Sequence, residues 1–314
     1  MQTNEVKGAT WTNYVFLFAS YAIPTPYLQL FLKARGLPLS RIGLLLGILE
    51  LAGIGGPIIL GHLADRRSAY RLLLFAGLLV SITALIPLQL TTALPMFVVC
   101  IAIMGFSYRA AMPLLDSLLG RIFPEPSRQY GGLRVAGSVS FTVVSLGLQP
   151  CGAISGDSSV SILAAFGAAT ALAAMAVWLI PPASVVQVGD DYGKPGETSN
   201  GLDARFWAVI GIIFLGRFGL GAYYSFFSLY LHDNFGLSNI GLLWAVGSLN
   251  EIPVVFFSGA LIAKLGVRVL LVISLAAISL RLGMFIFAPS FLVVALAQLL
   301  HAVTFGTFHT ASVA

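Results

Sequence analysis

Charged residues are scarce in this sequence of 314 residues. Asp, Glu, Lys and Arg make up only 9% of the chain, and hydrophobic residues make up 58%. An ordinary soluble domain has roughly a quarter charged residues. So few polar groups cannot cover a surface that faces water, which excludes an ordinary soluble domain and indicates that lipid surrounds the chain.

Cysteine is also rare, and the usual signs of an enzyme are missing. The two cysteines, Cys100 and Cys151, lie within apolar runs, where small buried side chains are expected rather than a disulfide or a metal site. No nucleotide-binding loop, metal-ligand spacing or nucleophile with its base can be found. We therefore expect no enzyme, no metal, no cofactor and no ATP-driven mechanism.

Long apolar runs recur instead along the whole chain. About 20 such residues cross the hydrocarbon core, and only helices or closed barrels satisfy their backbone there. We interpret the first run as a membrane helix that is kept and not as a cleaved signal peptide, because further spans follow it instead of a soluble domain. The predicted fold class is an all-α polytopic membrane protein with ten spans: 11–33, 41–62, 71–92, 94–119, 132–153, 159–180, 206–231, 238–261, 267–288 and 291–313.

The basic residues are unevenly divided between the two sides of these spans. Eleven of them fall on the N-terminal side and three, Lys33, Arg35 and Arg41, on the other. The positive-inside rule then places the N-terminus in the cytoplasm. Membrane orientation accounts for the net charge of +5, so no nucleic-acid partner is expected.

A polar stretch rich in Gly, Pro, Asp and Glu divides the chain. We predict an N-terminal six-helix bundle over 1–181, a cytoplasmic linker over 182–204 and an incomplete four-helix bundle over 205–314. The two parts are related by an internal repeat at an offset of 198 residues. The offset places Ser40, Ile42, Gly43, Leu44, Leu45, Gly61 and Leu63 on Ser238, Ile240, Gly241, Leu242, Leu243, Gly259 and Leu261.

The loop after the second span carries a recognisable motif. Gly61, Asp65, Arg66 and Arg71 resemble the signature gating loop of the major facilitator superfamily, and 259–268 is similar to a weaker copy. Close packing at the glycine and an Asp that accepts from a neighbouring helix N-terminus are expected. The resemblance implies two pseudo-symmetric bundles that alternate access to a central site, with about ten of twelve helices present and the C-terminus truncated.

Ionisable residues at membrane depth are functional candidates, because burying a charge there is costly. They are Glu50, Arg109, Asp116, Arg134, Arg217, Glu251, Arg281 and His301. Their order and surroundings resemble the lactose permease and 3-phenylpropionate permease branch of the superfamily. That resemblance implies substrate binding by Asp116 and Arg134, and proton coupling by Glu251, Arg281 and His301. Glu50 and Arg109 have no counterpart in this pattern and are predicted to pair with each other or with Arg281.

Two positions depart from the lactose permease pattern. Thr304 stands where a further acid is expected, which weakens the case for proton coupling, and Phe141 stands where a tryptophan stacks on sugar. Phe141 remains a candidate for substrate binding. Arg217 and Tyr223, on the seventh span, could receive an aromatic carboxylate, the guanidinium binding the carboxylate and the ring stacking on the ring. The alternative is that the aromatic residues of this span only pack against neighbours and lipid.

The leading functional prediction is a proton symporter of a small organic solute, an aromatic acid, sugar or nucleoside. The proton is the coupling ion. We expect a monomer in a bacterial inner (plasma) membrane. The alternatives are an efflux antiporter of drugs or metabolites, disfavoured because the close-set glycine and proline pattern is missing from the fifth span, and a truncated membrane protein that does not transport.

Overall fold

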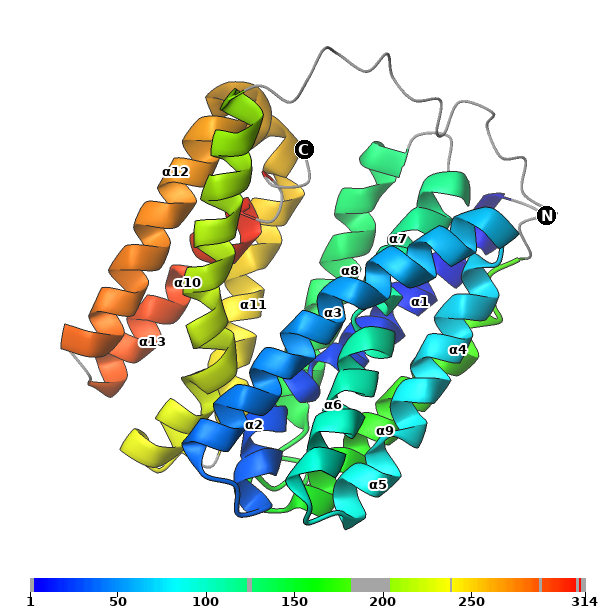
Figure 1. The fold of residues 1–314 in the computed structure, drawn as a ribbon. Helices are drawn as coiled ribbons and strands as arrows, with labels where there is room; N and C mark the ends of the chain where they lie inside the picture. Colours follow the sequence, from blue (N-terminus) through cyan, green and yellow to red (C-terminus); the bar gives the residue numbers. More distant parts are fainter. Residues whose placement is uncertain are drawn as a thin grey trace.

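The computed structural model describes residues 3–122, 126–181, 204–237, 239–287, 290–308 and 311. Helices make up nearly all of these residues, and no strand occurs among them. They are α1 (Thr3–Tyr21), α2 (Pro24–Ala34), α3 (Leu39–Arg67), α4 (Tyr70–Thr83), α5 (Leu85–Leu90), α6 (Leu94–Tyr108), α7 (Ala111–Ile122), α8 (Pro126–Gly147), α9 (Ser159–Val177), α10 (Ala204–Phe235), α11 (Ile240–Phe256), α12 (Ser258–Phe287), α13 (Phe291–Leu299) and the π-helix η2 (Ala302–Thr307), as labelled in Figure 1.

These elements combine into spans that match the prediction. In the described part of the chain, seven helical stretches are long and apolar enough to cross a membrane, and three shorter apolar stretches, Gly132–Gly147, Ile240–Phe256 and Phe291–Thr307, accompany them. Together they correspond to the ten spans expected from hydropathy. The predicted all-α membrane fold is confirmed.

Three of the predicted spans are broken into two helices, and a proline accounts for each break. Proline has no N–H to donate to the carbonyl four residues earlier, and its ring collides with that carbonyl. The breaks between α1 and α2, α4 and α5, and α6 and α7 lie about four residues before Pro26, Pro87 and Pro113. The last break leaves Arg109 at the C-cap of α6.

The internal repeat is also visible in the backbone torsion angles. Ser68 ends α3 in the left-handed region, with φ 50°, and it is the only residue other than glycine with a positive φ among the described residues. The offset of 198 places Ser68 on Gly266, where α12 is interrupted with φ 76°. The two copies of the loop therefore turn at the same position.

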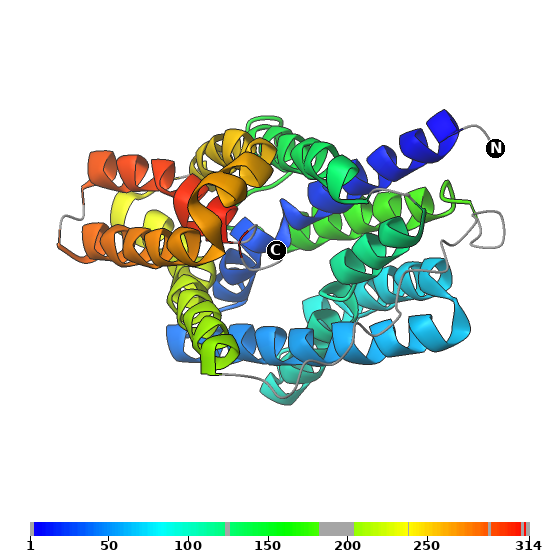
Figure 2. The ribbon, with the colours of Figure 1, turned by 90° about the horizontal axis from the view of Figure 1, so that it is seen from above.

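The helices form two neighbouring groups (Figures 1 and 2). α1 to α9 make one group and α10 to η2 the other, with contacts between α8 and α11 and between α2 and α10. One hydrophobic core runs through the first group and extends to α10 and α11. A smaller one joins α10 and α12 to Phe308 and Ala311, which follow η2. Residues 182–203 lie outside the described residues, and the predicted domain limits stay a prediction.

Candidate solute and proton site

The site lies where α8 meets α11, because the two helices come into backbone contact there. A Cβ on Gly241 would lie 2.1 Å from the carbonyl oxygen of Ser145, so only glycine fits. The amide of Gly241 donates to Oε1 of Gln149 (3.2 Å), and Oγ of Ser248 donates to the carbonyl of Ser138 (3.2 Å). This close approach fixes the register of α8 and α11 and brings their inner polar side chains together.

Arg134 of α8 and Glu251 of α11 face each other across this contact. They are only 7% and 4% exposed. Nη2 of Arg134 lies 3.8 Å from Oε1 of Glu251, and Nε2 of His301 lies 3.9 Å from Oε2. Both distances exceed that of a hydrogen bond. Charge attracts the pair, but the carboxylate is not locked to the guanidinium.

Arg281 of α12 approaches the same histidine from its other side. Arg281 is 2% exposed, and its guanidinium donates to Oε1 of Gln298 (2.6 Å) and Oγ1 of Thr304 (3.2 Å). Its Nη1 also lies 3.2 Å from Nδ1 of His301. Because a guanidinium can only donate, Nδ1 accepts, and the proton of the neutral ring is on Nε2, facing Glu251. Arg281 therefore holds His301 in the tautomer that presents an N–H to the carboxylate.

Several buried polar atoms of this cluster have no hydrogen-bond partner among the described residues. They are Nε of Arg134, Oε1 of Glu251, Nε of Arg281 and Nε2 of Gln298. Buried polar groups without a partner are costly, and most proteins avoid them. Three donors and one acceptor are thus available to the polar groups of a guest.

Aromatic rings surround the guanidinium of Arg281. Its Cζ lies 3.9 Å from the centre of the Tyr223 ring and 5.8 Å from that of Phe285. Tyr223 also contacts Trp244 and Phe227, with ring centres 5.3 and 4.7 Å apart. This side of the site can take an aromatic ring and a negative charge together.

Glycines and the π-helix allow the helices to come this close. A Cβ on Gly306 of η2 would lie 3.3 Å from Cγ of Glu251, and one on Gly247 would lie 3.2 Å from the His301 ring. η2 begins directly after His301. π-helical turns inside α-helices occur frequently at functional sites.

The structure brings most of the sequence candidates together, but not all. Asp116 accepts a hydrogen bond from the Tyr14 hydroxyl and lies within electrostatic reach of Arg134. Phe141 packs half-buried on α8, two turns from Arg134 on the same face. Arg217 is exposed and lies over Phe308, with 5.3 Å from Cζ to the ring centre. The guanidinium beside the Tyr223 ring is that of Arg281, and the binding of an aromatic carboxylate by Arg217 and Tyr223 stays a prediction.

Sequence reasoning missed three residues of the site. Gln298 bridges Arg281 and the Tyr223 hydroxyl, which donates to it at 3.2 Å. Phe18 lies under the Arg134 guanidinium, with 4.6 Å from Cζ to the ring centre, and Tyr14 bonds Asp116. Gln298 could have been found, since it stands one turn before His301 in an otherwise apolar helix.

Residues 11–314 match the MFS_1 like family. The chain belongs to this family. It is 26% identical over 310 residues to "Uncharacterized transporter YwbF" of Bacillus subtilis (strain 168), covering 94% of this chain and 74% of the relative. It is 24% identical over 303 residues to "Probable 3-phenylpropionic acid transporter" of Escherichia coli (strain K12), covering 95% and 79%. "Putative nucleoside transporter YegT" of the same organism is 26% identical over 321 residues, covering 94% and 71%.

Solved structures agree on the fold. The D323A mutant of the nucleoside transporter NupG superposes with a TM-score of 0.79 at 16% identity, covering 98% of this chain and 81% of that one. A bacterial homologue of the human lysosomal transporter Spinster gives 0.69 at 17% identity, covering 99% and 75%. The chain is thus an integral membrane transporter of the major facilitator type, and the predictions of family and of a transporter instead of an enzyme are confirmed.

The signature loop of this MFS transporter joins α3, α4 and α7 through side-chain hydrogen bonds, which differs from the expected arrangement. Asp65 accepts from Nη2 of Arg121 (2.9 Å) and from the Tyr70 hydroxyl, so side chains and not a helix N-terminus satisfy it. Arg71 donates to the carbonyl of Ile180 (2.9 Å). A Cβ on Gly61 would meet nothing within 4 Å in the described residues, so the close packing predicted at this glycine is wrong for this part of the chain.

Three further predictions have a structural outcome. Glu50 and Arg109 form an ion pair with each other and not with Arg281. Arg66 is exposed at the end of α3. Arg134, assigned by the count of basic residues to the N-terminal side, lies buried within α8. The orientation of the chain, the oligomeric state and the roles of the site residues stay predictions.

Proposed function

We propose that this transporter moves a small aromatic organic solute, foremost an aromatic monocarboxylate, together with a proton and by alternating access. One observation carries the proposal: the buried cluster of Arg134, Glu251, His301 and Arg281 spans both helix groups and keeps polar atoms without partners. A guest that bound there would contact both groups at once.

Charge neutrality gives the reason for coupling. With both carboxyls ionised, Arg134 and Arg281 balance Glu251 and Asp116, and the buried site has no net charge. An incoming monocarboxylate adds one negative charge, which is expensive in a water-poor site. A proton on Glu251 cancels it and frees the Arg134 guanidinium for the carboxylate of the solute. One proton and one anion therefore load the site together.

The surroundings favour an aromatic solute. The Arg281 guanidinium lies beside the rings of Tyr223 and Phe285, and Trp244 packs against Tyr223. The Arg134 guanidinium lies beside the Phe18 ring. Aromatic pairs gain from such offset or edge-on contacts. One of the relatives is named as a transporter of 3-phenylpropionic acid, which has one ring and one carboxylate.

Uptake into proteoliposomes tests the proposal. With radiolabelled 3-phenylpropionate and a medium more acidic than the lumen, we expect accumulation that a potassium diffusion potential leaves unchanged, because proton and anion cross as a neutral pair. Glu251→Gln should abolish accumulation, whereas the matched control Glu5→Gln, at an exposed residue of α1, should retain it. No accumulation of this or other aromatic acids would refute the proposed substrate. Accumulation by Glu251→Gln would refute the role of the carboxylate.

A nucleoside is the second candidate, and the free amide of Gln298 favours it. Its Nε2, together with Oε1 of Glu251, offers the donor and acceptor that bases and sugar hydroxyls require. A neutral nucleoside would bring no charge to balance the proton. Radiolabelled uridine should then accumulate in response to the membrane potential as well as to the pH gradient, which separates the two substrates in the same vesicles.

A further inference from the structure

Arg217 is a cation at membrane depth that the central site does not use. It is the fourteenth of the 32 residues of α10, so at least about 20 Å of helix lies on either side of it. The hydrocarbon core of a bilayer is only about 30 Å thick, and Arg217 therefore lies within it. Arg217 nevertheless makes no ion pair and no hydrogen bond with any residue that the structure describes.

The side chain of Arg217 is directed toward the interior of the helix bundle. Its Cζ lies 5.3 Å from the centre of the Phe308 ring, which is completely buried. Arg217 itself is exposed. A guanidinium is always charged, and at this depth it faces the bundle interior or water, because contact with lipid tails is costly. Arg217 therefore requires water or an anion beside it.

Gly216 allows Phe308 to come close to α10. A Cβ on Gly216 would lie 2.4 Å from the Phe308 ring, and a completely buried ring has little room to move aside. Phe308 directly follows η2. The close contact between α10 and the last span thus fixes where the neighbouring Arg217 lies.

Arg217 and the central site share one face of α10. Tyr224 follows Arg217 by seven residues, which is two turns or about 10 Å along the helix and returns to the same face. The Tyr224 ring contacts His301, with ring centres 6.5 Å apart. Arg217 and Glu251 both lie within electrostatic reach of the Tyr224 hydroxyl. The charge of Arg217 is therefore felt at the edge of the central site.

Gly221 leaves open space between Arg217 and Tyr224. It stands four residues after Arg217 and three before Tyr224, so the three residues lie on one face. Gly221 is exposed, and a Cβ there would meet no described atom within 4 Å. A guest on this face could touch the guanidinium and the tyrosine with no side chain between them.

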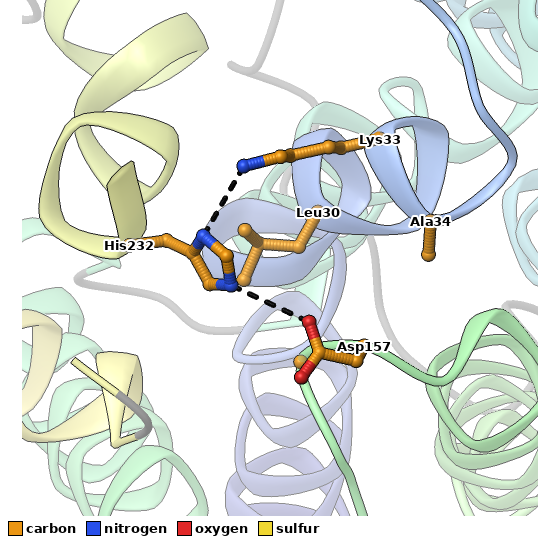
Figure 3. A pocket seen from close by; sticks show the side chains of 6 residues that line it. Leu30, Lys33, Ala34, Asp157 and His232 are labelled. Carbon is orange, nitrogen blue, oxygen red and sulfur yellow. Dashed lines mark hydrogen bonds and ion pairs between the residues drawn. The ribbon is translucent and has the colours of Figure 1, made fainter. Parts of the chain in front are cut away.

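Arg217 lies on the side of the central site that is away from the contacts of α10 with the first helix group. Near its end, α10 packs against α2, and Lys33 and Asp157 reach His232 there (Figure 3). Toward the beginning of α10 the ribbons of the two groups diverge (Figure 1). A solute that enters from that end passes Arg217 before it reaches the central site.

We propose that Arg217 is a recruiting site for a carboxylate, a second anion site that holds the solute between the solution and the central site. This inference rests on the anionic solute of the proposed function and adds an earlier step to it. A cation without an acidic partner raises the local concentration of anions. The carboxylate would bind the Arg217 guanidinium, and the ring of the solute would occupy the open space at Gly221 beside Tyr224.

The reactivity of an introduced cysteine tests the recruiting site without any solute. Gly221→Cys, in the full chain with Cys100→Ala and Cys151→Ser, would react in lipid nanodiscs with methanethiosulfonates that carry a sulfonate or a trimethylammonium group. Adding Arg217→Gln should lower the ratio of the anionic to the cationic rate about three- to tenfold, because a cation one turn away attracts one reagent and repels the other.

Two variants control this ratio. Arg217→Lys keeps the charge and should keep the ratio. Arg41→Gln removes an exposed arginine near the start of α3 and should leave the ratio unchanged. A ratio that ignores Arg217→Gln, a ratio that falls equally in Arg217→Lys, or a thiol at position 221 that neither reagent reaches would overturn the recruiting site.

Uptake kinetics test whether the solute uses the site. Arg217→Gln should raise the KM of radiolabelled 3-phenylpropionate about three- to tenfold and leave kcat unchanged, because the lost interaction belongs to loading and not to the later conformational change. Added salt should raise the KM of the wild type more than that of the variant, since salt screens an exposed charge. The KM of uncharged uridine should not change. Equal KM values for 3-phenylpropionate in variant and wild type, or an equal rise for uridine, would overturn recruitment by charge.

The two proposals can fail separately. A thiol ratio that depends on Arg217, in a protein that accumulates no aromatic acid, would support the anion site and refute the proposed substrate. Accumulation of 3-phenylpropionate with a KM and a thiol ratio that ignore Arg217 would leave the proposed function standing and refute the recruiting site.

Discussion

Replacing Gly241 with alanine should separate the two helix groups where they touch most closely. The new Cβ would lie 2.1 Å from the Ser145 carbonyl oxygen and 2.7 Å from the Tyr27 hydroxyl. Real Cβ contacts with backbone are longer than about 3.0 Å, so α11 must move by roughly 1 Å away from α8. That movement would also stretch the 3.2 Å hydrogen bond from the Gly241 amide to Gln149.

The cost follows from this displacement. Inserting one carbon into a well-packed contact destabilises a protein by about 1–3 kcal/mol, and the stretched hydrogen bond contributes on the order of 0.5–1.5 kcal/mol. We expect the closed arrangement to lose a factor of about 10 or more in its equilibrium, since 1.4 kcal/mol corresponds to tenfold. The distance between spin labels on α8 and α11 should lengthen accordingly.

Gly43 provides the matched control, because the offset of 198 places it on Gly241. Its Cβ would meet only the end of the Phe226 ring, at 3.2 Å, and a ring can shift. Gly43→Ala should therefore cost much less than Gly241→Ala in both the label distances and thermal unfolding in detergent. Equal effects of the two substitutions, or a Gly241→Ala protein with wild-type distances, would refute the reasoning from backbone contact.

Two more predictions concern the buried and half-buried arginines. Gln298→Leu removes an acceptor from the Arg281 guanidinium, so a buried donor loses its partner, and the free energy of unfolding should fall by about 1–3 kcal/mol. Thermal unfolding followed by circular dichroism measures this loss. A variant as stable as the wild type would contradict the prediction. At the Glu50–Arg109 pair, the double variant Glu50→Gln with Arg109→Met should lose less stability than the sum of the two single losses, with a coupling of about 0.5–3 kcal/mol. Strict additivity in the same unfolding assay would show that the pair does not interact.

Hydropathy was sufficient to predict the ten spans, because crossing lipid restricts a chain to long apolar helices. The family was predicted from the resemblance of the loop at Gly61, Asp65, Arg66 and Arg71 to a known signature. Pro26, Pro87 and Pro113 account for the three helix breaks, but Pro57 and Pro253 lie inside unbroken helices, so a proline by itself does not predict a break. The membrane-depth charges of α8, α11, α12 and the last span did come together. Their order in the sequence was a good guide because each of these spans carries few ionisable residues.

Helix faces and the partners of side chains were harder to predict from the sequence. Arg217 and Tyr223 are six residues apart, which puts them about 120° apart around α10, so closeness in sequence did not mean a shared face. The packing expected at Gly61 depends on what lies beside α3, which the residue itself does not encode. The local sequence left open whether Glu50 would pair with Arg109 or with Arg281, because three-dimensional packing decides between such partners; the structure shows the pair with Arg109.

The shared turn at Ser68 and Gly266 shows that the two halves can be compared by backbone conformation as well as by sequence. The two residues differ, and a serine in the left-handed region costs roughly 1 kcal/mol or more relative to glycine, yet the chain adopts positive φ at both. The duplicated halves have thus kept a torsion angle where they have not kept the amino acid. Aligning the halves by backbone dihedral angles should therefore recover corresponding positions that comparison of residues passes over.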